Sequence, residues 1–133
     1  ARLFPPNGTL ARRIVEAPFS VPEGRAALAR LLDDAPGFTA LVCGNDPLAI
    51  GALLEAGARG LSVPRDLSIA GFDDVDLAGA LTPGLTTVHV PSAEIGRRAA
   101  QRLLARLAGE APPRAEALPA PLVVRGSTGP SPR

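Results

Sequence analysis

The segment LSIAGFDDVD at residues 67–76 constrains the fold more than any other stretch of the chain. A mostly apolar run stops at Gly71, and three carboxylates follow at Asp73, Asp74 and Asp76. This order is typical of a buried strand that delivers polar side chains to its carboxyl end. Open α/β sheets bind their ligands at that end of the strands. The segment therefore predicts a central strand with a binding edge.

A similar pattern occurs earlier, at residues 39–46. The run TALVC meets Gly44 and is followed by Asn45 and Asp46. If both runs are parallel strands of one sheet, their carboxyl ends lie at the same edge. We therefore expect Asn45 and Asp73 to face one crevice.

Strand and helix patterns alternate along much of the chain. A capping box at residues 20–23 opens one helix, and a second begins with Asp46 as its N-cap and Pro47 at its first position. Such alternation predicts an α/β fold, with an open parallel sheet flanked by helices and right-handed crossovers. The expected elements are strand 14–17, helix 21–34, strand 39–43, a helix from 46 to 57 or 60, strand 67–70, strand 85–90, a helix from 91 or 92 to 107, and strand 122–125.

The composition of the chain fits a single globular domain. A chain of 133 residues with 46% apolar and 20% charged residues suits one globular domain, and a net charge of +1 does not indicate nucleic acid or membrane as a partner. The single Cys43 cannot form an internal disulfide, and because it sits in an apolar run we expect it to be a buried structural thiol. No apolar run approaches the roughly 20 residues of a membrane span, and no signal-peptide core begins the chain, so we expect a cytoplasmic protein.

Catalytic and metal chemistry find little support in the residue pattern. Asp73, Asp74 and Asp76 lack EF-hand spacing, and a hard cation needs about six oxygen ligands, so no metal is expected. His89 stands alone in a strand, without a serine elbow or second histidine, and is interpreted as a structural or interface residue. We expect no cofactor and no enzyme activity.

Taken together, several segments resemble the effector-binding core of the LacI/GalR family of bacterial transcription regulators. The matching segments are VCGNDPLAIGALLEAGARGLSVP at 42–64, RDLSIAGFDDVDLAGALTPGLTTV at 65–88, IGRR at 95–98 and LVVRGST at 122–128. They arrive in family order and spacing. The family is described as a helix-turn-helix DNA reader followed by two similar α/β subdomains that hold the effector between them. The resemblance implies most of the C-terminal subdomain, of the periplasmic-binding-protein-like type I fold.

The resemblance also implies a ligand site. Asn45 and Asp73 match family positions that hydrogen-bond sugar hydroxyls or purine edges, and Phe72 and Asp46 are further candidates. A carboxylate accepts paired hydroxyls, whereas an amide both donates and accepts. The alternative is that Asn45 and Asp73 merely cap helices or turns, where both residue types are common. Val42 stands where some relatives place a ring that stacks on the ligand, and it offers no such ring.

The implied partners are a small effector, either sugar or nucleoside, and DNA only through an N-terminal domain that this chain is expected to lack. A binding module of a transport system and an enzyme of flavodoxin-like architecture remain alternatives. The expected organisation is a disordered or incomplete start at 1–12, an effector-binding subdomain at 13–90, a crossover helix at 91–109, a linker at 110–121, a returning strand at 122–126 and a disordered tail at 127–133.

The helix at 91–107 carries an apolar stripe that in the family packs in the other subdomain. Without that subdomain the stripe is expected to find a substitute, most simply a second copy of the chain, so we expect a homodimer. Its residues are Ile95, Ala99, Leu103 and Leu107.

Overall fold

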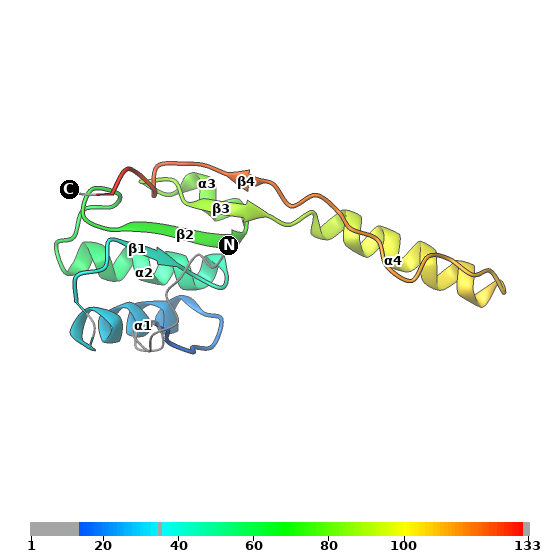
Figure 1. Ribbon diagram of the computed structural model, residues 1–133, viewed down its shortest axis with the longest axis horizontal. Coiled ribbons are helices and arrows are strands. Elements are labelled where there is room, and N and C mark those ends of the chain that lie inside the picture. Colours follow the sequence, from blue (N-terminus) through cyan, green and yellow to red (C-terminus); the bar gives the residue numbers. More distant parts are fainter. Residues whose placement is uncertain (1–13, 35, 132–133) are drawn as a thin grey trace, which may run out of the picture.

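A four-stranded sheet with strand order β1-β2-β3-β4 organises the computed structural model, which describes residues 14–34 and 36–131 (Figure 1). β1 (Ala40–Val42), β2 (Ser68–Asp73) and β3 (Thr86–His89) run parallel, as predicted. β4 (Leu122–Val123) pairs antiparallel with β3. The sheet is therefore mixed, and the predicted parallel arrangement holds for the first three strands. The chain leaves β3 at its carboxyl end and returns to that same end, which makes β4 antiparallel.

Two helices cover one face of the sheet in successive layers. α2 (Asp46–Ala58) packs against β2, and α1 (Val21–Asp34) lies outside α2 (Figure 1). The two helices approach closely because glycines face each other's backbones. A Cβ atom built on Gly24 or Gly51 would lie 2.2 Å from a backbone oxygen of the opposite helix.

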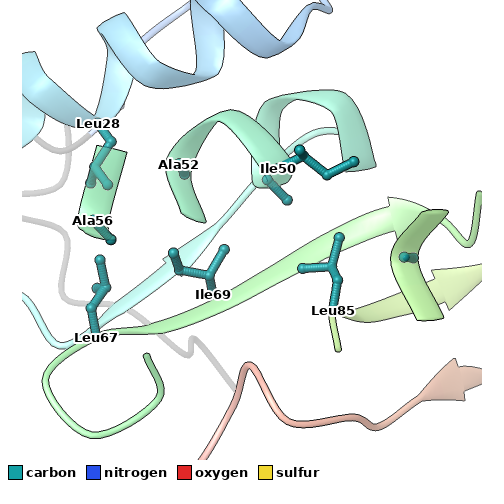
Figure 2. Close-up of a cluster of buried hydrophobic side chains, with 9 residues drawn as sticks. Leu28, Ile50, Ala52, Ala56, Leu67, Ile69 and Leu85 are labelled. Atoms are coloured by element: carbon teal, nitrogen blue, oxygen red, sulfur yellow. The ribbon is translucent and has the colours of Figure 1, made fainter. Parts of the chain in front are cut away.

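The apolar core fills the space between α1, α2 and the sheet, as Figure 2 shows. Leu28 enters from α1, Ile50 from α2, and Ile69 from the central strand. Alanines on α2 keep the helix close to the sheet, because small side chains allow near contact. The buried cluster consists of Leu28, Ala49, Ile50, Ala52, Ala56, Leu67, Ile69, Ala78 and Leu85.

Further sequence predictions differ from the structure. The strand expected at 14–17 does not form, and Pro18, which directly follows, has no N–H to donate to a ladder. A short helix, α3 (Asp76–Ala80), appears where no helix was expected. The segment from residue 127, predicted to be disordered, is hydrogen-bonded to the sheet through Ser127, Thr128 and Gly129. The start expected at 1–12 lies outside the described residues.

Ser127 attaches the segment after β4 to the sheet. Its side chain is fully buried, and its hydroxyl donates to the Ile69 carbonyl at 2.6 Å and accepts the Thr86 N–H at 2.8 Å. The Ile69 N–H in turn donates to the Ser127 carbonyl at 2.8 Å. The segment after β4 is therefore fastened to both β2 and β3.

α4 (Ser92–Leu107) projects from the sheet, and residues 110–121 run back beside it to β4 (Figure 1). The structure describes the whole of α4, and none of its residues is buried. Arg98 of this helix pairs with Glu116 of the returning segment, and Leu103 and Leu107 are exposed. No helix in the described parts of the chain is long and apolar enough to cross a bilayer.

Candidate functional site

The candidate site lies where β1 and β2 end. Val42 pairs with Ala70 in the parallel register, and the Cys43 N–H donates to the Ala70 carbonyl at 2.8 Å. Both strands therefore reach their carboxyl ends at the same edge of the sheet. Asn45 follows the first strand and Asp73 ends the second. The predicted adjacency of these two strand ends is confirmed.

Asn45 is the N-cap of α2. Its Oδ1 accepts the Leu48 N–H at 3.0 Å, and the residue is 7% exposed. The prediction that Asp46 caps this helix was wrong by one residue, because Asn and Asp are almost equally good caps. The Asn45 side-chain oxygen is committed to the helix, so its amide nitrogen is the group it can present to a ligand.

Asp46 is the first residue of α2 and is completely buried. Its Oδ1 accepts from the Thr87 hydroxyl at 2.6 Å, and its Oδ2 accepts the Val75 N–H at 2.9 Å. Asp46 has no exposed surface and both of its carboxylate oxygens already accept hydrogen bonds, so neither oxygen is presented at the edge of the sheet. It instead ties α2 to β3 and to the turn that follows β2.

Asp73 occupies an unusual backbone conformation at the end of β2. Its φ is 117° and that of Asp74 is 59°, so two consecutive non-glycine residues have positive φ. Such conformations are costly and concentrate at functional sites. Partial burial and, second, the nearby carboxylate of Asp46 raise the pKa of Asp73 above its ordinary value. Among the described residues, no donor reaches its side chain, which leaves an acceptor available at the edge.

Asp74 is bound on both oxygens. Arg125 Nη2 donates to Oδ1 at 2.7 Å, and His89 Nδ1 lies 3.0 Å from Oδ2. The hydrogen bond from Arg125 is the main reason that the pKa of Asp74 is lowered. Sequence reasoning did not single out Arg125, although the segment at 122–128 that carries it contributed to the family resemblance. His89, interpreted from the sequence as a structural or interface residue, contacts Asp74 in this way.

Phe72 follows Gly71, whose Cβ position faces α2, so by strand alternation Phe72 points to the side of the sheet away from α2. It is 42% exposed and lines a hollow together with Val90, Pro91 and Ile95 at the start of α4. Val42 is 82% exposed and brings no ring to the edge, as the sequence indicated. In residues 14–34 and 36–131, no group of three His, Cys, Asp or Glu side chains is placed to hold a metal ion.

The chain is similar in sequence and fold to proteins of one family. The family model of the periplasmic binding protein-like domain matches residues 7–128. An uncharacterised HTH-type transcriptional regulator in the aml 5′ region of Streptomyces limosus is 47% identical over 111 residues, covering 83% of this chain and 31% of the relative. The lac repressor dimer bound to operator and the anti-inducer ONPF superimposes with a TM-score of 0.81 at 31% identity, covering 85% of this chain and 40% of that one. The chain belongs to the effector-binding domain of the LacI/GalR family.

A further member of the LacI family was solved with a sugar. The regulator from Arthrobacter sp. FB24, in complex with lactose, superimposes with a TM-score of 0.75 at 31% identity, covering 85% of this chain and 43% of that one. The chain thus spans about a third of the curated regulator and under half of each solved LacI-family chain. The matched part carries the sheet edge with Asn45 and Asp73.

Proposed function

We propose that this chain forms one wall of the effector site of a LacI/GalR-family regulator, and that Asp73 and Asn45 bind a small polar metabolite, a sugar or a nucleoside. The observation that carries the proposal is the Asp73 carboxylate. It stands at the end of the central strand, receives no donor from the described residues, and sits on a strained backbone. A carboxylate fixed in this way accepts two neighbouring hydroxyls, the pattern that a sugar ring or a ribose offers.

Asn45 would add a hydrogen-bond donor to the site beside the Asp73 acceptor. Its oxygen caps α2, so the amide nitrogen would donate to a ligand oxygen or ring nitrogen. Asp73 ends β2 and Asn45 caps α2 just after β1, so both side chains are anchored by regular elements of the domain. The lactose complex of the Arthrobacter regulator favours a sugar over a nucleoside as the first compound to try.

Effector binding would act on DNA affinity through closure of a cleft. The second wall and the DNA reader would be supplied by parts of the regulator outside the matched region. A ligand that binds one closure better than the other shifts the balance between them, and coupling of this kind is typically about 1–3 kcal/mol. We propose that the regulator works in the cytoplasm as a dimer, since a solved relative is a dimer bound to its operator.

A binding module of a transport system would share the fold. The relatives named above are transcriptional regulators, which favours the regulator. The coding sequence separates the two. A helix-turn-helix encoded upstream in the same reading frame supports a regulator, and a secretion signal supports transport.

The functional test uses the product of the longest reading frame that contains this chain. Thermal unfolding is measured with a panel of sugars and nucleosides, starting with lactose. A ligand at a hundred times its Kd stabilises the folded state by about 2.7 kcal/mol, which raises Tm by several degrees. The compound that raises Tm should also change the affinity for operator DNA in a gel shift. A compound that binds without changing DNA affinity would contradict the regulatory role.

A further inference from the structure

Arg125 lies just beyond β4, and its backbone is anchored to the sheet independently of its side chain. Its N–H donates to the Thr86 hydroxyl at 2.9 Å, which anchors its backbone to β3. One arm of its guanidinium, Nη1, donates to the Leu85 carbonyl at 2.8 Å. The other arm, Nη2, reaches Asp74 Oδ1 at 2.7 Å. The forked group therefore joins the start of β3 to the turn after β2.

Two glycines line the path of this side chain. A Cβ atom on Gly84 would lie 3.3 Å from Arg125 Cδ, and one on Gly79 would lie 3.7 Å from its Nε. The contact at Gly84 is tight, so a side chain there would require the arginine to shift by a few tenths of an ångström. The Arg125 side chain is therefore packed against these two glycines where it extends toward Asp74.

His89 holds the second oxygen of Asp74. Its Nδ1 lies 3.0 Å from Oδ2, and because an ionised carboxylate only accepts, Nδ1 carries the proton in this contact. The side chain of Asp74 is 15% exposed. Asp74 is therefore gripped from two sides, by the end of β3 and by the segment that follows β4.

The turn held in this way is the one that presents Asp73. With φ of 117° and 59°, Asp73 and Asp74 occupy conformations that a free chain seldom adopts. The next residue, Val75, is held by Asp46 through its N–H, and the Asp73 carbonyl accepts the Val90 N–H at 3.3 Å. The surrounding contacts keep the backbone in this conformation.

We propose that Arg125 and His89 are positioning residues that, through Asp74, hold Asp73 in place at the ligand edge. The proposal rests on the ligand role proposed for Asp73. Neither Arg125 nor His89 is proposed to contact the ligand. Their effect is transmitted by the two oxygens of one carboxylate to the backbone of the preceding residue.

The test measures amide hydrogen exchange by NMR in the unliganded chain, because exchange reports on the turn without any ligand. Arg125→Gln should accelerate exchange of the Val75 and Val90 amides at least tenfold, while amides within α2 change less than twofold. Arg97→Gln removes a guanidinium that pairs with Glu94 on the exposed face of α4, and it should leave both amides unchanged.

A second variant covers the case in which Arg125→Gln does not fold. Asp74→Asn keeps a residue that tolerates positive φ but removes the charge that Arg125 and His89 bind. It should accelerate the same two amides. Arg125→Lys keeps the charge without the fork, so its acceleration should fall between those of wild type and Arg125→Gln.

Unchanged exchange at both reporter amides in these variants overturns the positioning role, and so does acceleration that is equal throughout α2 and the turn. The proposed function fails by a different result. Suppose that Arg125→Gln accelerates exchange in the turn, but Asp73→Asn binds the effector found in the panel as tightly as wild type. The positioning role is then supported, and the ligand role of Asp73 is contradicted.

Discussion

Gly71→Ala gives a sharp test of how the buried carboxylate of Asp46 is built into the domain. Gly71 lies in the middle of β2, under the first turn of α2. A Cβ atom there would lie 2.2 Å from Asp46 Oδ1, a distance that real Cβ contacts essentially never show. It would also lie 3.2 Å from Ala49 Cβ and from Leu85 Cδ2. The methyl group has no room, so the carboxylate must move.

The cost follows from what the carboxylate binds. Moving Oδ1 breaks its 2.6 Å bond from Thr87 and strains the 2.9 Å bond from Val75. A hydrogen bond to a charged group contributes about 1.5–3 kcal/mol, and the substitution disturbs two such bonds. We therefore expect Gly71→Ala to lower the free energy of unfolding by about 3–5 kcal/mol.

Urea denaturation followed by far-UV circular dichroism measures this loss, since the chain has neither Trp nor Tyr to report by fluorescence. At a slope of about 1–3 kcal/mol per molar urea, the midpoint should fall by more than about 1 M. Gly57→Ala is the matched control, because a Cβ on this exposed residue of α2 meets nothing within 4 Å. It should stabilise by about 0.5–1 kcal/mol. If Gly71→Ala unfolds at the wild-type midpoint while Gly57→Ala is stabilised, the placement of Asp46 is wrong.

Three other predictions concern single residues. Ser127→Ala leaves two buried backbone groups of β2 and β3 without their partner, and urea titration should show a loss of about 1–3 kcal/mol; no loss would mean that the tail is not fastened. The lowered pKa of Asp74 means that its contribution is present above about pH 4 and is lost as pH falls through the folded pKa. The stability difference between wild type and Asp74→Asn should therefore shrink in urea titrations from pH 7 to pH 3, and a constant difference would refute this. Burial raises the pKa of Cys43 to about 12, so iodoacetamide should alkylate it at pH 8 about a thousandfold more slowly than a free thiol, and a normal rate would contradict the burial.

Local sequence signals predicted most of the elements because their causes lie close together in the chain. The bounds of α1 were predicted correctly, since the Glu23 N–H lies 3.4 Å from the Ser20 hydroxyl that caps it and Pro36 and Gly37 follow it. Apolar runs that stop at Gly44 and Gly71 located β1 and β2. α3 was missed because a helix of this length shows no apolar period, and the direction of β4 is not encoded in its own two residues.

Contacts between distant residues were beyond the reach of this reasoning. Arg125 binds a carboxylate 51 positions earlier, and Thr87 binds one 41 positions earlier. No spacing rule connects such pairs. Asn45 and Asp73 could be proposed as ligand residues because each stands at the end of a recognisable apolar run, whereas the burial of Asp46 depends on how α2 packs over Gly71.

The most direct test of the account is calorimetry on the reading-frame product with the effector found in the panel. Asp73→Asn should weaken binding about 10- to 100-fold, the loss expected when a charged hydrogen-bond acceptor is removed. Asp76→Asn changes a carboxylate three positions on, at the exposed start of α3, and should alter Kd less than about threefold. Equal Kd values for wild type, Asp73→Asn and Asp76→Asn would contradict the central claim that Asp73 binds the effector.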